Sequence, residues 1–288
     1  MTPITDQPDL YAALRHSGVQ PDDLSALIAA NPPTVAARLG AVDHGLLRAV
    51  MRAGLGQPAV RTAPQIVAHL HEVDPAPLFQ PDVAASRTLA LLTNGEHPDM
   101  PAFSDRAFDA WFAEKSVPYG IGTYGEDRSV YRSAQFADAA SPERRTRHLG
   151  IDVFAPAGTP LFAPLPGRVL HLTYNADPLD YGHTLILQHE ADGLCFFTLY
   201  GHLAATLPRL LQSGAWVTAG QHIADLGDWP ENGGWAPHVH FQIMTDMLDQ
   251  TAGNFFGVGH SSLWDVWQTI CPDPNLILRL PQSAFTLD

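Results

Sequence analysis

The sequence predicts an α+β protein in which a helical N-terminal region precedes an antiparallel β-sheet. Residues 1–115 carry short apolar patterns of helical period, separated by proline or glycine. From His148 onward the apolar residues recur with a period of two, which is typical of strands with one buried face. Many short segments of this kind, broken by turns, indicate an antiparallel sheet, sandwich or open barrel.

Residues 1–115 are expected to form a small helical bundle of unknown role, such as a cap over a groove or a docking element for a partner enzyme. Acidic residues follow Pro8 and Pro21, where the first turn of a helix favours negative charge. No chemical motif occurs in this region. The helices are expected at residues 10–14, 24–28, 34–39, 44–53, 64–71, 84–92 and 105–115.

Residues 116–147 are expected to be a turn-rich linker that leads into the sheet domain, residues 148–288. The Gly120-Ile121-Gly122 sequence lacks the third glycine and the following helix of a nucleotide-binding loop. Two short helices are expected in the sheet domain, at residues 207–211 and 262–269. The strands are expected at residues 148–153, 160–163, 167–172, 184–189, 195–200, 216–217, 222–224 and 238–244.

The charge of the chain argues against anionic partners. The formal net charge is −14, and from His148 onward three basic residues face thirteen acidic ones. Such a surface repels nucleic acid, anionic lipid and acidic wall polymers, so a neutral or cationic substrate is expected. No basic segment followed by an apolar run opens the chain, and no stretch approaches the roughly 18 apolar residues of a membrane span. The chain as written is therefore expected in the cytoplasm, and export through a signal outside it stays open.

Three segments of the sequence predict a metal site. His238 and His240 are two residues apart on an expected strand, so their side chains share one face. His148 and Asp152 share the face of another strand, and Gly150 between them leaves space for an ion. One histidine of the first pair would complete a set of three ligands with an open fourth position, which suits a catalytic zinc.

A further histidine lies in Tyr200-Gly201-His202-Leu203, at the end of an expected strand. Beside a metal, His202 could donate to a developing oxyanion or act as a base for water. The sequence contains no H-E-x-x-H motif, so no helical glutamate is expected to serve as the base.

Five dispersed motifs, from His148 to about Ile243, resemble the M23 (lysostaphin/LytM-type) zinc metallopeptidases. In chain order they are H-x-G-x-D, G-T-P with A-P-x-x-G-x-V, Y-G-H-L, G-x-x-V-x-x-G-Q-x-I-A-x-x-G and P-H-x-H-F. The resemblance implies an antiparallel sheet crossed by a narrow groove, and cleavage of peptidoglycan cross-links or glycyl bonds in a peptide or peptidoglycan-fragment substrate. It implies a Zn²⁺ cofactor with ligands His148, Asp152 and His240, and catalytic roles for His202 and His238.

The segment before the paired histidines departs from the family pattern. Residues 227–236 contain two tryptophans where a short turn of small residues is usual. This form also resembles M23-like segments embedded in larger cytosolic proteins. Two alternatives therefore accompany the peptidase prediction: an intracellular M23-like binding or regulatory module, and a metal-dependent amide hydrolase that acts on a small molecule.

Overall fold

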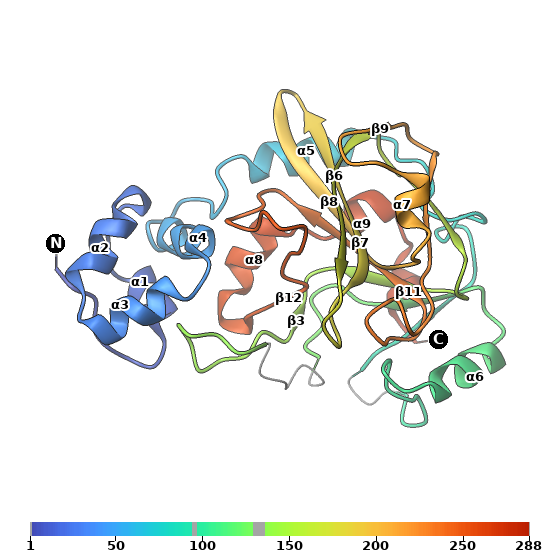
Figure 1. Cartoon of the computed structure of the whole chain (residues 1–288), viewed down its shortest axis with the longest axis horizontal. Helices are drawn as coiled ribbons and strands as arrows, with labels where there is room; N and C mark the ends of the chain where they lie inside the picture. Colours follow the sequence, from blue (N-terminus) through green and yellow to red (C-terminus); the bar gives the residue numbers. More distant parts are fainter. Residues whose placement is uncertain (1, 94–96, 129–135, 288) are drawn as a thin grey trace.

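The computed structural model describes residues 2–93, 97–128 and 136–287 and has an α+β fold (Figure 1). The first four helices lie at one end of the molecule, and the strands lie at the other. Within the described residues, no helix combines the length and apolar character that crossing a membrane requires.

The N-terminal helices begin at residues suited to capping or to a first turn. The Asp9 carboxylate accepts hydrogen bonds from two backbone amides of α1, and Asp43 accepts one from the amide of Leu46 in α4. Pro33 occupies the first turn of α3, where its missing N–H costs nothing. The helices are α1 (Leu10–Arg15), α2 (Leu24–Ala30), α3 (Pro33–Gly40), α4 (His44–Gly54) and α5 (Ala63–Glu72).

Within the described residues, the strands form one sheet of eight and two small sheets of two. The large sheet has the order β1-β2-β4-β11-β8-β7-β6-β9, and among these described strands only the β1/β2 pair is parallel. Its strands are β1 (Thr88–Ala90), β2 (Tyr119–Gly122), β4 (Ile151–Phe154), β6 (Gly167–Asn175), β7 (Gly182–Ala191), β8 (Leu194–Leu203), β9 (Trp216–Val217) and β11 (His238–Met244). The small sheets pair β3 (Arg147–His148) with β12 (Val258–Gly259) and β5 (Pro160–Phe162) with β10 (His222–Asp225).

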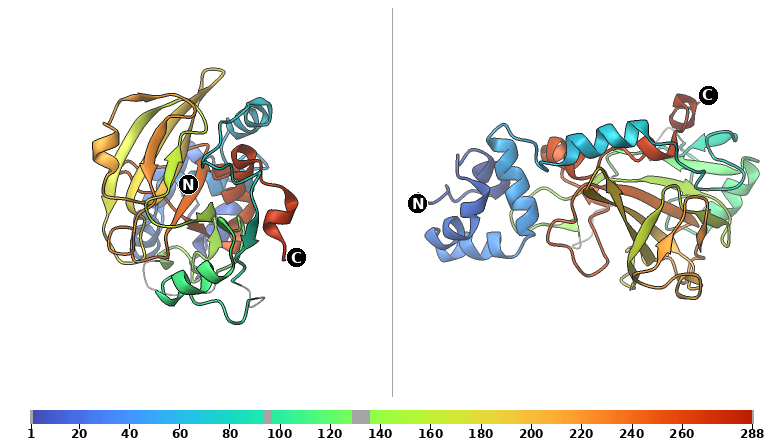
Figure 2. Two further views of the ribbon diagram at one scale, coloured as in Figure 1. Left: turned by 90° about the vertical axis from the view of Figure 1, so that its right-hand side faces the viewer. Right: turned by 90° about the horizontal axis from the view of Figure 1, so that it is seen from above.

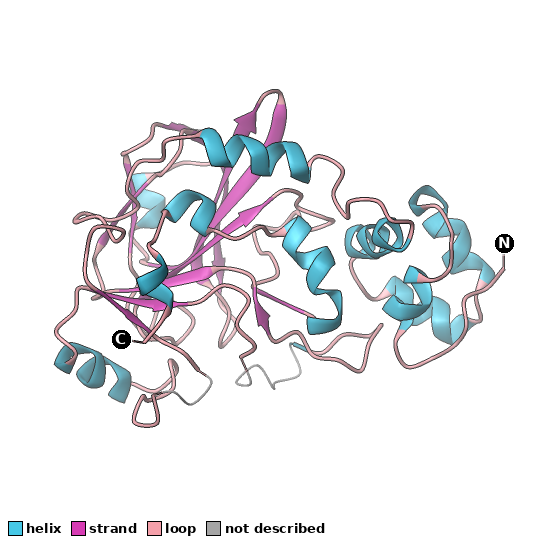
Figure 3. Ribbon diagram, turned by 180° about the vertical axis from the view of Figure 1, so that it is seen from behind, coloured by secondary structure: helices cyan, strands magenta, loops and turns pink. Residues whose placement is uncertain are grey.

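Short helices surround the sheet. They are α6 (Ala107–Glu114), α7 (Leu207–Leu210), α8 (Trp264–Ile270) and α9 (Asn275–Leu278), with 3₁₀ turns at Ser261–Leu263 and Gln282–Phe285. A further 3₁₀ turn, Pro21–Asp23, lies between α1 and α2. Seen from behind and from above, α8 lies between the sheet and the N-terminal helices, and α5 reaches from those helices along the sheet (Figure 2, right, and Figure 3).

The expected helix at residues 84–92 is wrong, because this segment contains strand β1. Thr88 and Ala90 pair with Tyr119 and Ile121 of β2, and the amide of Leu91 continues the ladder to the carbonyl of Ile121. Pairing with a distant segment outweighs the local helical pattern here. Strand β2 itself comes from the expected linker, so two segments that precede His148 contribute to the large sheet.

Strand β11 separates the apolar core from the candidate site. Val239, Phe241 and Ile243 belong to the core cluster that also contains residues of β4, β7 and β8. His238 and His240 alternate with them and lie on the opposite face, as the two-residue period predicts. Every residue of β11 is buried, so both faces of the strand are covered.

Candidate active site

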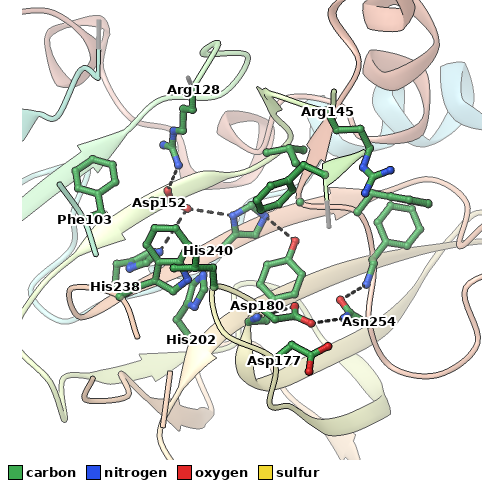
Figure 4. Close-up of a pocket in the computed structure, with 18 of the residues that line it drawn as sticks. Phe103, Arg128, Arg145, Asp152, Asp177, Asp180, His202, His238, His240 and Asn254 are labelled. Atoms are coloured by element: carbon green, nitrogen blue, oxygen red, sulfur yellow. Dashed lines mark hydrogen bonds and ion pairs between the residues drawn. The ribbon is translucent and has the colours of Figure 1, made fainter. Parts of the chain in front are cut away.

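Four strands bring the five predicted site residues together. Figure 4 shows four of them, Asp152, His202, His238 and His240, close to one another. His148 ends β3 and Asp152 lies in β4, while His202 lies near the end of β8 and His238 and His240 lie in β11. The antiparallel register places His240 opposite Asp152 on one side and opposite Gly201 on the other. All five side chains are buried, with at most 6% of each residue exposed.

His148, Asp152 and His240 present three donor atoms at the corners of a nearly regular triangle. His148 Nε2 lies 3.0 Å from His240 Nδ1 and 3.2 Å from Asp152 Oδ1, and the last two atoms are 3.1 Å apart. A tetrahedral zinc ion with bonds of about 2.0 Å separates neighbouring ligand atoms by roughly 3.3 Å. The triangle therefore has the size of a zinc site.

The outward nitrogens of two rings make the inward ones available as ligands. His148 Nδ1 lies 2.8 Å from the carbonyl oxygen of Thr123, and His240 Nε2 lies 2.8 Å from Oε1 of Gln242. Because both partners only accept, each outward nitrogen carries the proton and each inward nitrogen carries a lone pair. Two lone pairs and a carboxylate oxygen then face one another, an arrangement that a bound cation satisfies.

Gly150 provides the space that this arrangement needs. A Cβ atom at this position would lie 2.6 Å from both Cε1 and Nε2 of His240. Any larger residue would therefore displace the ring of a candidate ligand. The H-x-G-x-D motif has a glycine at this position because the imidazole of His240 packs directly against it.

The ionisation states of the ligands suit a metal ion at neutral pH. Burial, followed by the positive charge of Arg128, lowers the pKa of His148 to about 4, so its imidazole is neutral. Burial alone would raise the pKa of Asp152, but His148 and Arg128 hold it well below its ordinary value. Neutral imidazoles and an ionised carboxylate are the forms that bind zinc.

His202 and His238 form a second pair beside the triangle, with ring centroids 4.3 Å apart. Their Nδ1 atoms lie 2.7 Å and 2.6 Å from the carbonyl oxygens of Asn232 and Ala236 respectively. This fixes the proton on Nδ1 and leaves Nε2 as a base in each ring. His238 Nε2 is 4.0 Å from Asp152 Oδ1, so it lies beside the ligand triangle without being part of it.

Burial lowers the pKa of both rings of this second pair. The pKa of His238 falls to about 4, and the proximity of His238 adds to the effect of burial on His202. His202 also has a backbone φ of +63°, which is uncommon for a residue other than glycine. Its amide nevertheless donates a hydrogen bond of 2.7 Å to the carbonyl of Tyr181.

Two further residues of the site lie outside the sequence motifs. Tyr181 Oη lies 3.4 Å from His240 Nε2, and its ring centroid lies 5.6 Å from that of His202. Arg128 donates through Nη1 to Oδ2 of Asp152 at 2.6 Å. Both come from turn segments without periodicity, so only their place in the folded chain brings them to the site. The signal available for Tyr181 is its position in the Asp180-Tyr181-Gly182 turn that begins β7.

The site opens into a cleft of about 290 Å³. Its walls combine aromatic side chains with the acidic pair Asp177 and Asp180 and the basic Arg145. None of the described residues that line the cleft precedes Phe103, so helices α1–α5 do not form its wall. The structure therefore does not place the N-terminal helices as a cap over the site.

The two tryptophans before His238 share one cluster but differ in their contact with the cleft. Both belong to an aromatic cluster that includes Phe108 and Trp111 of α6, and Trp235 also lines the cleft. The indole N–H of Trp229 donates to Asp109 of α6 at 2.8 Å. The amide of Ala236 also donates to the carbonyl of Phe103 at 2.7 Å. The unusual residues of this loop thus attach one wall of the cleft to the segment that contains α6.

Part of the chain is similar to known proteins. Residues 146–252 match the model of peptidase family M23. The uncharacterized lipoprotein YgeR of Escherichia coli K12 is 33% identical over 94 residues, which cover 33% of this chain and 33% of that protein. An uncharacterized metalloprotease of Haemophilus influenzae is 30% identical over 121 residues, 40% of this chain and 23% of that protein. The chain thus spans no more than a third of either curated relative.

Two of the similar solved structures are also peptidases. A zinc-containing peptidase from Vibrio cholerae is 29% identical, with a TM-score of 0.29, over 35% of this chain and 28% of that one. The catalytic domain of lysostaphin from Staphylococcus simulans is 22% identical, with a TM-score of 0.34, over 54% of this chain and 96% of that one.

Proposed function

We propose, from the membership of residues 146–252 in peptidase family M23, that the protein is a zinc-dependent endopeptidase. The observation that carries the proposal is the triangle of donor atoms from His148, Asp152 and His240, each held in the form that binds zinc. When bound, zinc would polarise the scissile carbonyl and acidify a water molecule.

His202 and His238 are the proposed catalytic residues. Both rings are neutral at pH 7, and both present Nε2 as a base, because Nδ1 is engaged by a backbone carbonyl. One of these two rings would accept a proton from the attacking water. A protonated ring would then donate a proton to the leaving amine. The low pKa that burial gives these rings favours rapid release of that proton.

Tyr181 is a candidate donor to the oxygen of the scissile carbonyl. Its hydroxyl lies next to the ligand ring of His240, at 3.4 Å, and on the side of the site that His202 also faces. A phenol in this position can stabilise negative charge that develops on the substrate.

The proposed substrate is a peptide with small residues at the cleaved bond, such as a glycyl or peptidoglycan-type peptide. A cleft of about 290 Å³ with aromatic walls has room for a backbone with few bulky side chains. The net charge of −14 favours a neutral or cationic peptide. Docking of a partner through the N-terminal helices and a cytoplasmic location stay predictions.

The test is cleavage of oligoglycine and of peptidoglycan-derived peptides by the zinc-loaded protein. We expect cleavage that a chelator abolishes, and a loss of about 10²–10⁴-fold in kcat/KM for His238→Ala. His222→Ala is the control, because His222 pairs with Asp225 on β10 away from the cleft. A zinc-bound protein that binds these peptides without cleaving them would instead indicate a binding module.

A further inference from the structure

A buried arginine holds the carboxylate of the candidate metal ligand Asp152. Arg128 donates from Nη1 to Asp152 Oδ2 at 2.6 Å and from Nε to Glu126 Oε2 at 3.0 Å. The side chains of Arg128 and Asp152 are each only 2% exposed, and that of Glu126 is 9% exposed. Neither ligand histidine has a basic side chain as its outward partner, since Thr123 and Gln242 fill those positions.

The backbone places Arg128 alongside the strand that carries His148. The amide of Arg128 donates to the carbonyl of Thr146 at 3.0 Å, and Asp127 forms a bridge with Arg147. The amide of His148 donates in turn to the carbonyl of Glu126 at 2.9 Å. This short ladder fixes the distance between the arginine and the site.

The neighbouring sheet leaves room for the guanidinium. Gly122 of β2 pairs with Asp152, and a Cβ atom at Gly122 would lie 2.6 Å from Nη2 of Arg128 and 3.1 Å from Cβ of Asp152. A glycine therefore stands where any larger side chain would separate the arginine from the carboxylate. The contact between Arg128 and Asp152 thus depends on β2, on β4 and on the segment that precedes β3.

The two oxygens of Asp152 have different partners. Oδ2 accepts from Arg128, while Oδ1 faces His148 Nε2 at 3.2 Å and His240 Nδ1 at 3.1 Å. We propose that Arg128 is a positioning residue that reserves Oδ2, so that Asp152 offers a metal ion one oxygen only. The inference rests on the proposed function. A single carboxylate oxygen keeps the protein ligands at three and leaves a coordination position for water and substrate.

Glu126 makes this arrangement compatible with a cation. An arginine a few ångströms from a divalent ion repels it strongly unless its charge is balanced. The Glu126 carboxylate balances the arginine and is itself fixed, since Oε1 accepts from the amide of Thr93 at 2.6 Å and from its hydroxyl at 2.9 Å. The Arg128–Glu126 pair is therefore nearly neutral towards the site while it orients Asp152.

The experiment is a cobalt(II) titration of the metal-free full-length protein, followed by visible absorption and by competition with a chelator. The main variant is the double substitution Arg128→Met with Glu126→Gln, which leaves the net charge unchanged. We expect about 10–100-fold weaker cobalt binding, as is typical when an outer partner of a ligand is lost. We also expect weaker absorption bands, because the released Oδ2 can join the coordination sphere and raise the coordination number.

Arg145→Met is the matched control. Arg145 lines the same cleft and pairs with a different buried carboxylate, that of Asp138. Its cobalt affinity and spectrum should equal those of the wild type. Equal losses in this control and in the double variant would overturn the proposal, because they would reflect general destabilisation.

Unchanged affinity and spectrum in the folded double variant would also overturn the proposal. If that variant does not fold, Arg128→Lys is the test variant. A lysine ammonium lacks the rigid planar donors with which the guanidinium binds both carboxylates. The proposal then requires at least about threefold weaker cobalt binding and an altered spectrum, and wild-type behaviour contradicts it. A wild-type protein that binds no cobalt contradicts the proposed function as well, whereas a cobalt-binding wild type with unaffected variants contradicts only the role of Arg128.

Discussion

Each imidazole of the candidate site is oriented by an acceptor outside the site. For His202 and His238 the acceptors are backbone carbonyls, which cannot take the donor role. For His148 the acceptor is the carbonyl of Thr123, and for His240 it is the side chain of Gln242. The tautomers therefore follow from the folded backbone, and the lone pairs converge before any ion binds.

Gly150 leaves the space that the ring of His240 occupies, and enlarging this residue tests the contact. Gly150→Ala places a methyl group 2.6 Å from two atoms of the His240 ring and 2.9 Å from the carbonyl oxygen of Phe241. The ring must move, so zinc affinity should fall by about 10–100-fold, as measured with a competing chelator.

The control for this change is Gly40→Ala, since no atom lies within 4 Å of a Cβ at Gly40. Circular dichroism should show that both variants are folded. A Gly150→Ala protein with wild-type zinc affinity would show that the ring of His240 is not held by contact with this glycine.

The residues that the sequence predicts for the site share two properties. They occur in short motifs, and they lie on strands whose two-residue period fixes the direction of each side chain, as for His238 and His240. Arg128 and Tyr181 have neither property. Their contacts depend on which turn lies beside which strand, and that information is carried by long-range pairing that a local pattern does not contain.

Among the elements, β7 and β8 contain a buried polar chain that the mechanism does not use. His189 Nδ1 lies 2.8 Å from the carbonyl of Pro166, and Nε2 lies 2.7 Å from Oγ1 of Thr198, which in turn is 3.1 Å from the hydroxyl of Tyr200. Burial lowers the pKa of His189 from 6.5 to about 4. The ring is therefore neutral in the folded protein at pH 5, where the unfolded chain binds a proton.

This difference predicts a pH-dependent contribution of His189 to stability. Because the folded pKa is the lower one, the contribution is complete above pH 6.5 and is lost as the pH falls towards 4. Between pH 7.5 and pH 5 the wild type should lose about 2 kcal/mol of unfolding free energy that His189→Gln does not lose. Urea unfolding at the two pH values measures this difference.

Gly40→Ala serves as the comparison, because it removes no titratable group and a Cβ at Gly40 meets no other segment within 4 Å. It should lose as much stability on acidification as the wild type. Identical pH dependence in His189→Gln and the wild type would show that His189 does not titrate with a lowered pKa.

The strands at residues 148–244 are predictable because each has a clean period and bounding turns. The segment at residues 84–92 is not, because its apolar residues fit a helix equally well. Its strand exists only through pairing of Thr88–Ala90 with β2. The helix expected at residues 84–92 is wrong because pairing with a distant strand outweighs the local pattern of apolar residues.

In the whole molecule, the N-terminal helices share a core with the other elements. Leu10, Leu47 and Val50 belong to the same buried cluster as Val266 and Trp267 of α8. Polar contacts reinforce this packing. The hydroxyl of Tyr11 donates to Asp138 at 2.7 Å, the side-chain Nε2 of Gln250 donates to Asp43 at 2.7 Å, and Arg15 pairs with Asp265.

Removal of residues 1–61 should therefore destabilise the remaining chain rather than activate it. The deletion exposes apolar side chains on α8, each worth about 1.5–3 kcal/mol when fully buried. Thermal unfolding should show a lower midpoint, and peptide cleavage should not increase. An unchanged midpoint together with faster cleavage would instead support the interpretation of these helices as an inhibitory cap.

The sequence predicts a helical region and a sheet region. It does not predict that helices α1 and α4 share a core with α8. Nothing in the period of a helix identifies the surface that its apolar face will cover. The same holds for the loop at residues 227–236, whose Trp229 packs against α6 about 120 positions earlier in the chain.

The proposed function requires that His148, Asp152 and His240 bind a zinc ion. Its most direct test is the metal content of the native protein, measured by plasma mass spectrometry beside the Asp152→Asn and His240→Ala variants. We expect one zinc ion per wild-type chain and a large loss of zinc in both folded variants. A wild-type protein without stoichiometric zinc, or variants that retain it in full, would contradict the proposed metal site.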